Sequence, residues 1–193
     1  MTLKNPLWRT NMDNGASSYR RFLDGDESAF DEIMKELFDN LVFFINRYVS
    51  DIHAAEDIAI DTFTDLIVHK NRYNFKVSLK TYLFMIGRSR ALNYIKHRKR
   101  LTLVDFSEAE YIAAYEEPFE EVILADQRKR ILHQAIDQLP VDMRTVIHLI
   151  YFEDMSYADS ARVMKKSVKQ VDNLLYRAKK ELRAILGDNG DLL

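Results

Sequence analysis

The chain has 193 residues, 47% of them hydrophobic, and a formal net charge of -2. This length allows one large domain or two small ones, each with its own core. The absence of cysteine excludes disulfides, thiolate metal sites and cysteine nucleophiles, and fits a reducing cytosol. No segment has the roughly 18 apolar residues that a membrane span needs. We therefore expect a soluble, cytoplasmic protein without membrane insertion, and nothing in the composition implies a cofactor.

The nearly neutral total contains two blocks of opposite charge. Residues 70–100 hold ten Lys and Arg residues and no acidic residue, whereas residues 101–126 hold eight Asp and Glu residues and no Lys or Arg. Because binding of a phosphate backbone needs a local concentration of positive charge, the first block keeps nucleic acid among the possible partners.

The pattern predicts an all-α fold. Only five Gly and three Pro occur, and apolar residues recur at spacings of three and four. We expect a flexible tail over residues 1–17. The first predicted helix starts at residues 26–28 and carries an apolar stripe from Phe30 to Leu41. A second starts at Asp51, followed by acids that favour a helix N-terminus.

A third predicted helix, residues 78–100, carries most of the basic block. An acidic linker is expected over residues 101–125, because this stretch lacks a sustained period and contains Pro118. The linker divides the chain into two small helical domains, residues 18–100 and residues 126–187, with a short tail at 188–193.

The second domain has the pattern of a helix-turn-helix. After an apolar helix over residues 143–152, Ser156 and Ser167 each mark a helix start, eleven residues apart. Ser167 and Gln170 have the spacing of a capping box. Eleven residues fit one short helix and a tight turn, which a helix-turn-helix requires before its second helix can enter a major groove.

The last predicted helix would bury one face and present polar groups on the other. The outward residues are Lys169, Gln170, Asn173, Tyr176, Arg177 and Lys180. Residues 162–183 hold eight basic residues against two acidic ones, a surplus that suits DNA. The alternative is an ordinary helical hairpin with a solvated charged face.

Aromatic residues accompany the basic residues of the first domain. They are Tyr73, Phe75, Tyr82, Phe84 and Tyr94. Aromatic faces beside a cationic track hold unpaired bases, at about 1–3 kcal/mol per stacked base. Any one of these rings could instead belong to the core.

Three acids, Asp57, Asp61 and Asp65, recur at four and would share one helical face. A metal site is conceivable there, but no histidine lies within one turn on that face. An acidic face that is solvated, or that docks a basic partner, is the favoured reading. No nucleophile and base form a recognisable pair, so no catalytic residue is predicted.

Four segments together resemble the extracytoplasmic-function (ECF) sigma factors of bacterial RNA polymerase. They are AEDIAIDTF (55–63), YLFMIGR (82–88), LPVDMR (139–144) and SYADSA (156–161). The resemblance implies that the first domain binds core RNA polymerase and melts the minus-ten promoter element, and that the second reads the minus-thirty-five element as duplex. It also implies an anti-sigma factor as a further partner.

The resemblance assigns roles by position. Polymerase contacts are expected at Asp57, Ile60, Asp61 and Phe63. Minus-ten DNA contacts are expected at Arg72, Tyr73, Phe75, Lys76, Lys80, Tyr82, Arg88, Ser89, Asn93 and Lys96. Minus-thirty-five contacts are expected at Lys166, Ser167, Lys169, Gln170, Asn173, Tyr176 and Arg177.

The chain departs from the family pattern at several positions. The family usually has Gln at Ile60, Trp at Tyr82 and Asn at Ser89. In the turn, Lys165 stands where glycine is common, which leaves the turn conformation open. Asp172 stands where a basic residue is common, and an acid there could accept a hydrogen bond from a cytosine amino group.

Two other functions stay open from the residues alone. A stand-alone helix-turn-helix repressor or activator would bind a palindromic duplex as a dimer. A metal-dependent nuclease would use the acidic helix. The second, separately basic and aromatic domain favours the sigma factor.

Overall fold

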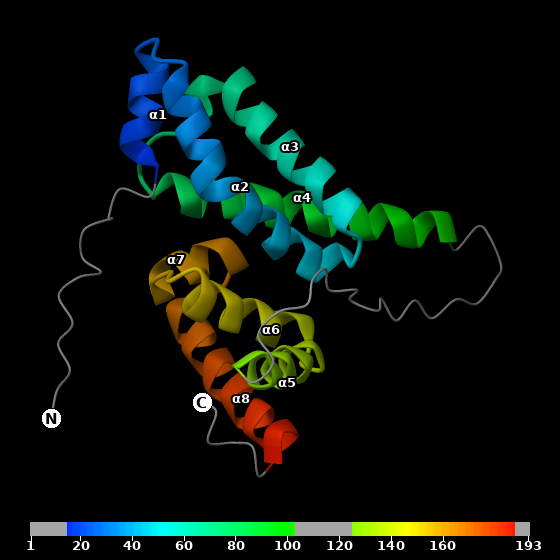
Figure 1. The fold of residues 1–193 in the computed structure, drawn as a ribbon. Helices are drawn as coiled ribbons and strands as arrows, with labels where there is room; N and C mark the ends of the chain where they lie inside the picture. The colour runs from blue at the N-terminus through cyan, green and yellow to red at the C-terminus, as the bar shows by residue number, and fades with distance from the viewer. Residues whose placement is uncertain (1–14, 103–124, 188–193) are drawn as a thin grey trace, which may run out of the picture.

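The protein is described by a computed structural model over residues 15–102 and 125–187; residues 1–14 of the predicted N-terminal tail, most of the predicted acidic linker and the predicted tail at 188–193 lie outside these residues. The first domain comprises α1 (Ala16–Leu23), α2 (Ser28–Val49), α3 (Ile52–Val68), a short 3-10 helix η2 (Lys70–Arg72) and α4 (Leu79–Thr102). The second comprises α5 (Ala125–Asp137), α6 (Val141–Ile147), a π-helical turn η3 (His148–Phe152), α7 (Tyr157–Met164) and α8 (Val168–Leu186). Two helical domains are therefore confirmed (Figure 1).

Side-chain caps start three of these helices where the sequence predicts them. Asp51 Oδ1 accepts the Ala54 N–H at 3.1 Å, and Ser156 Oγ accepts the Asp159 N–H at 3.0 Å. Each cap gives a hydrogen-bond partner to a backbone N–H that the first helical turn leaves unpaired. The predicted starts of α3 and α7 are thus confirmed, and the capping box of α8 is described with the site below.

Helix α1 lies before the first helix that the sequence predicts, and its first two residues, Ala16 and Ser17, come from the predicted flexible tail. It has eight residues, and Tyr19 is its only buried side chain. The segment therefore lacks the repeated apolar positions from which a helix could be predicted. The Tyr19 hydroxyl donates to the carbonyl oxygen of Leu66 at 3.0 Å, and burial is the main cause that raises its pKa to about 12. Tyr19 therefore fastens α1 to the end of α3.

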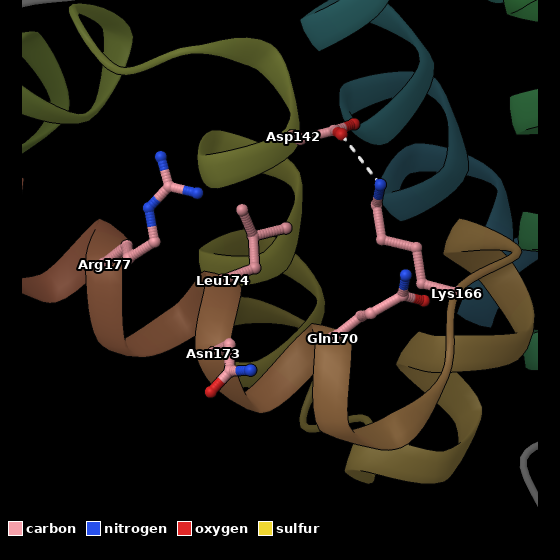
Figure 2. A pocket seen from close by; sticks show the side chains of 6 residues that line it. All are labelled: Asp142, Lys166, Gln170, Asn173, Leu174 and Arg177. Carbon is pink, nitrogen blue, oxygen red and sulfur yellow. Dashed lines mark ion pairs between the residues drawn. The ribbon is translucent and has the colours of Figure 1, made fainter.

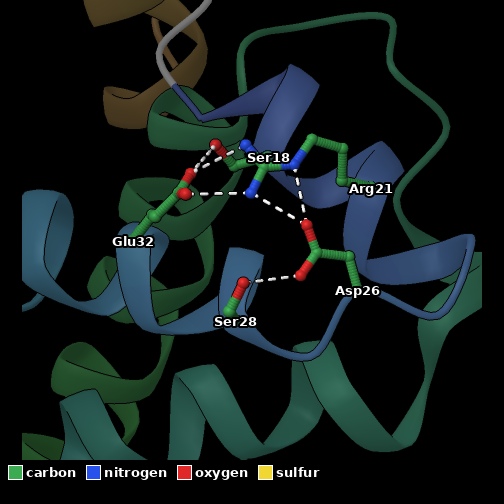
Figure 3. A network of polar contacts seen from close by, with 5 residues as sticks. All are labelled: Ser18, Arg21, Asp26, Ser28 and Glu32. Carbon is green, nitrogen blue, oxygen red and sulfur yellow. Dashed lines mark hydrogen bonds and ion pairs between the residues drawn. The ribbon is translucent and has the colours of Figure 1, made fainter.

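A polar network also joins α1 to the start of α2 (Figure 3). Arg21 bridges Asp26 and Glu32, with closest nitrogen–oxygen distances of 3.0 and 2.8 Å. Ser18 donates to Glu32, and Ser28 donates to Asp26. The hydrogen bonds from Arg21 and Ser18 lower the pKa of Glu32. All five side chains are solvent-exposed or nearly so, so the network orients α1 more than it stabilises the fold.

Helix α2 is the centre of the first domain, with α1, α3 and α4 against it. Phe44 of α2 and Phe84 of α4 are fully buried, with ring centroids 4.7 Å apart. Gly87 allows the close approach of α4, because a Cβ there would lie 2.9 Å from Leu41 Cδ1. This contact explains the glycine in the YLFMIGR segment.

The two domains contact each other directly, α4 with α7 and α2 with α6. The Tyr48 hydroxyl of α2 accepts hydrogen bonds from Thr145 Oγ1 at 2.8 Å and from Arg88 Nε at 3.1 Å. The Phe44 ring stacks on His148 with centroids 5.9 Å apart. Buried side chains thus continue from one domain into the other in a closed arrangement.

Candidate nucleic-acid interface

The turn between α7 and α8 has the geometry of a helix-turn-helix. Lys165 adopts φ 54° and ψ 45°, in the left-handed region. Its N–H donates to the Arg162 carbonyl at 3.2 Å, and the Lys166 N–H donates to the Ala161 carbonyl at 2.9 Å. This pair of bonds is the Schellman motif that ends a helix. Lysine therefore takes the conformation that glycine adopts more easily, at a cost of about 1–2 kcal/mol.

Helix α8 opens with a complete capping box. Ser167 Oγ accepts the Gln170 N–H at 3.2 Å, and Gln170 Oε1 accepts the Ser167 N–H at 2.8 Å. The predicted start of this helix is confirmed. Both backbone N–H groups are satisfied by side chains, so the helix begins at a fixed point relative to α7.

One face of α8 is buried and the other is open. The buried side chains include Val171, Leu175, Ala178 and Leu182. The residues predicted to bind DNA lie on the open face, at Lys169, Gln170, Asn173, Tyr176 and Arg177. Tyr176 is 72% exposed, although it is a large aromatic side chain. The helix thus presents polar and aromatic groups that the fold itself does not use.

A hollow of about 310 Å³ runs along this face of α8 (Figure 2). Its lining comprises Asp142, Lys166, Gln170, Asn173, Leu174 and Arg177. Lys166 Nζ lies 3.0 Å from Asp142 Oδ2, so this predicted DNA contact is already paired with an acid of α6. The half-buried Leu174 adds an apolar wall to an otherwise polar hollow.

In the first domain, the loop before α4 combines buried and open residues. Tyr73 is only 3% exposed, and its hydroxyl donates to the Val77 carbonyl at 2.7 Å. Its ring packs against Tyr19 and Tyr82. Tyr73 therefore belongs to the core in this structure, which is the alternative that the sequence left open for each of these aromatic rings. Phe75 keeps partial exposure at a positive φ of 60°.

The polar residues predicted to follow the minus-ten strand differ in availability. Lys76, Asn93 and Lys96 are exposed, and Ser89 is partly so. Arg72 is exposed but lies 3.1 Å from an Asp65 oxygen. Arg88 is half-buried, with its Nε bonded to Tyr48.

Lys80, from the same predicted set, is bound by the second domain. Its Nζ lies 2.7 Å from Glu153 Oε2 and donates to the Glu153 carbonyl oxygen at 2.9 Å. His148 Nε2 lies 3.1 Å from the other carboxylate oxygen of Glu153. The side chains of His148 and Glu153 are 5% and 4% exposed. The Lys80–Glu153–His148 cluster is thus a largely buried polar contact between the domains.

Burial and charge act in opposite directions in this cluster. Burial is the main influence on His148 and lowers its pKa, with the Glu153 contact opposing it, so the ring is neutral near pH 7. Burial also disfavours the Glu153 carboxylate, but the contacts with His148 and Lys80 together outweigh it and lower the pKa. Glu153 is therefore ionised, and its charge is balanced by Lys80.

The acidic face of α3 is largely open. Asp57 and Asp61 are exposed, and Ile60 between them is 51% exposed. Phe63 is buried against Phe30 and Phe38. An exposed apolar side chain among acids suits contact with a basic protein surface.

Asp61 and Asp65 face cations. Arg90 lies 3.8 Å from Asp61 and 3.7 Å from Asp65, and Asp65 also lies 2.9 Å from His69. His69 follows Asp65 by four residues, so the expectation that no histidine lies within one turn of these acids is wrong. Within residues 15–102 and 125–187, no group of three His, Asp or Glu side chains could hold a metal ion. Over the same residues, no helix has the length and apolarity to cross a membrane.

Sequence reasoning does not find Tyr48, Thr145, His148 or Glu153, which join the domains. They come from segments that the periodicity assigns to two separate cores. The unusual acid after the apolar helix, Glu153, is the only local signal, and it does not identify its partner.

These features define a two-domain DNA-binding protein, in which a helix-turn-helix accompanies a second helical domain with an exposed basic helix. The family models "Sigma-70 region 2" and "Sigma-70, region 4" match residues 33–101 and 129–182. The chain is 30% identical to the RNA polymerase sigma-H factor of Pseudomonas aeruginosa over 82% of its own length and 86% of that protein. It is 26% identical to the ECF RNA polymerase sigma factor SigM of Bacillus subtilis, over 80% and 93%.

The chain belongs to the ECF sigma factors of bacterial RNA polymerase. It is accordingly a sigma factor that directs RNA polymerase to specific promoters.

Two solved structures share the fold. The sigma factor RpoE of Bartonella quintana, solved with the anti-sigma factor NepR, has a TM-score of 0.65 at 23% identity, over 83% of this chain and 98% of that one. CnrH, solved with the cytosolic domain of CnrY, has a TM-score of 0.63 at 19% identity, over 92% and 99%.

Proposed function

We propose that the two domains divide the promoter between them. Residues 18–100 bind core RNA polymerase and help to melt the minus-ten element, and residues 126–187 read the minus-thirty-five element as duplex. The observation that carries this division is the open face of α8, which a capping box and a Schellman turn hold at a fixed angle to α7. A recognition helix needs such a fixed angle to enter a major groove.

Polymerase binding is assigned to the acidic face of α3. Asp57, Ile60 and Asp61 supply the contact surface, because all three are exposed. Phe63 supports that surface from below, since it lies in the core. The protein is regulatory rather than catalytic. It acts in the bacterial cytoplasm, where RNA polymerase binds promoter DNA.

Minus-ten binding is assigned to the loop before α4 and to the exposed side of α4. Arg72, Lys76 and Lys96 supply positive charge, and Asn93 and Ser89 supply hydrogen bonds. Phe75 and Tyr82 supply partly open aromatic faces, on which an unpaired base can stack.

The buried Tyr73 has a different role in this scheme. Its hydroxyl bond to Val77 and its ring contacts hold the minus-ten loop in shape. Arg88 reaches the strand only after it leaves Tyr48 of its own domain, and Lys80 only after it leaves Glu153 of the second domain. Promoter binding therefore requires the two domains to separate.

Minus-thirty-five binding is assigned to the open face of α8. Lys169 and Arg177 suit phosphates, and Gln170, Asn173 and Tyr176 suit base edges. Lys166 contributes once Asp142 releases it. Ser167 positions the helix through its cap rather than by reading a base.

An anti-sigma factor is the further partner that we propose. Two structures with this fold were solved with such a factor or with a cytosolic partner domain. The closed arrangement, in which residues assigned to the promoter are occupied, is one that an inhibitory partner could stabilise.

The test is reconstituted transcription. Core polymerase, the full chain and a library of bacterial promoters should give open complexes and transcripts that core polymerase alone does not give. Asp57→Asn combined with Asp61→Asn should weaken co-purification with core polymerase. A matched change on α2, Glu36→Gln with Asp39→Asn, should not, because those exposed acids lie outside the proposed surface. Polymerase-independent binding to a palindromic duplex, with no transcript, would identify a stand-alone regulator instead.

A further inference from the structure

Gln170 and Asn173 both line the hollow on α8 and carry the same amide group (Figure 2). Their hydrogen bonds differ. Gln170 Oε1 accepts the Ser167 N–H at 2.8 Å as part of the capping box. Within the described part of the chain, the Asn173 side chain has no hydrogen-bond partner. The amide of Gln170 thus takes part in the helix cap, whereas the amide of Asn173 can rotate to present either its oxygen or its NH₂ to a ligand.

The cap determines which end of the Gln170 amide is left for a ligand. A backbone N–H can only donate, so the atom facing it has to be the amide oxygen. The amide NH₂ of Gln170 is then the group that remains available, at the edge of a hollow that also contains Lys166 and Arg177. The amide oxygen keeps a second lone pair, but the cap fixes its position at the Ser167 N–H, so the donors are the groups that Gln170 can direct at a ligand.

This restriction changes what a glutamine can recognise in a major groove. A free Gln or Asn contacts adenine with two bonds, donating to N7 and accepting from the N6 amino group. A glutamine whose oxygen is held in a cap cannot turn that oxygen toward the N6 amino group to make the second bond. It can donate to N7 and O6 of guanine or to O4 of thymine. Adenine N7 is an acceptor too, but it lies beside the N6 amino group, so a glutamine that presents only donors there makes one bond and sets a second donor against the amino group.

We propose that Gln170 is a specificity-determining residue that selects a guanine or thymine acceptor in the upstream promoter duplex, whereas the unconstrained amide of Asn173 is suited to adenine. The proposal rests on the proposed function of α8 as the reader of that duplex. For Gln170 to make both bonds to adenine, its oxygen would have to leave the cap and unpair the Ser167 N–H. The hydrogen bond between Gln170 and Ser167 therefore determines the base preference, although the Ser167 N–H itself does not contact DNA.

The decisive variant is Gln170→Glu. Glutamate also closes a capping box, so the cap oxygen is preserved while the donor is replaced by an acceptor. Asn173→Asp makes the same chemical change, with the same added charge, on the amide that is not committed to a cap. Both variants weaken DNA binding through charge, so the readout is base preference rather than affinity.

The experiment uses holoenzyme reconstituted from core polymerase and the full chain, with promoters randomised in the upstream duplex element. Transcribed templates are sequenced. With the wild-type chain, one position should favour guanine or thymine. With Gln170→Glu, that position should shift toward cytosine or adenine by about three- to tenfold, the size of one hydrogen bond. Asn173→Asp should leave that position unchanged and alter a different one.

The outcomes separate the inference from the function that it rests on. If wild-type holoenzyme selects no upstream bases beyond those that core polymerase selects alone, the proposed function of α8 fails. If selection occurs but Gln170→Glu selects the same bases as wild type, or if the position sensitive to Gln170 favours adenine in the wild type, the inference is overturned. Equal melting temperatures for wild type and Gln170→Glu would show that the cap is intact.

Discussion

Glu153→Gln is the change that tests the closed arrangement most directly. It preserves the shape of a side chain that lies between Lys80 of α4 and His148, and removes its charge. The Lys80 side chain is 13% exposed and that of Glu153 is 4% exposed, so water screens the pair weakly.

The expected cost follows from these exposures. Removing one partner of a buried ion pair costs about 3–5 kcal/mol, because the other charge stays buried without compensation. Lys80 keeps its bond to the Glu153 backbone carbonyl at 2.9 Å and part of its exposure to water. We therefore expect a loss of about 2–3 kcal/mol, below the full buried-pair value. Such a loss is a large fraction of the total of about 5–15 kcal/mol for a folded protein.

The assay is denaturant unfolding of the full chain near pH 7.5, with Glu36→Gln as control. Glu36 is exposed and has no ion pair among the described residues, so its change should stay within about 0.5 kcal/mol. Because the chain has no cysteine, Lys35→Cys and Arg183→Cys provide unique label sites in the two domains. Glu153→Gln should lengthen or broaden the distance between the labels. Equal unfolding free energies and equal distances in the two variants would refute the reasoning.

Three further predictions concern other sites. Asp142→Asn should release Lys166, and the plot of log binding constant against log salt for duplex binding should steepen by about 0.9; an unchanged slope would remove Lys166 from the interface. Gly87→Ala should destabilise the chain by about 1–3 kcal/mol in urea unfolding, because the new Cβ would lie 2.9 Å from Leu41; an unchanged midpoint would contradict the close approach. Acidification should also destabilise it, since the folded pKa of His148 lies below its usual 6.5 and the unfolded chain binds the proton first. Stability should therefore fall as pH drops below about 6.5, and His148→Gln should flatten that part of the pH profile.

Local rules account for most of what the sequence predicts correctly. The caps at Asp51, Ser156 and Ser167 depend on side chains within three residues of the helix start, so they can be read from the chain. The eleven-residue spacing of the last two caps is enough to predict the helix-turn-helix. Helix α1 is not predicted, because it is short and buries a single side chain.

Contacts between distant segments account for what cannot be predicted. Lys80 and Glu153 are 73 residues apart, and nothing near either one indicates the other. Tyr73 and Phe75 are neighbours of similar chemistry in one loop, yet one ring is buried and the other is partly open. Spacing in a loop has no period, so it cannot decide which aromatic ring enters the core.

Lys80 also has a quantitative consequence for promoter recognition. If the Lys80 ammonium can bind either Glu153 or a promoter strand, but not both, the contact between the two domains competes with DNA binding. The apparent affinity for the minus-ten strand is then the intrinsic affinity multiplied by the fraction of molecules that are open. Each 1.4 kcal/mol of closure energy lowers that affinity about tenfold. Polymerase, which we expect to hold the domains apart, would restore the affinity without making any new contact to DNA.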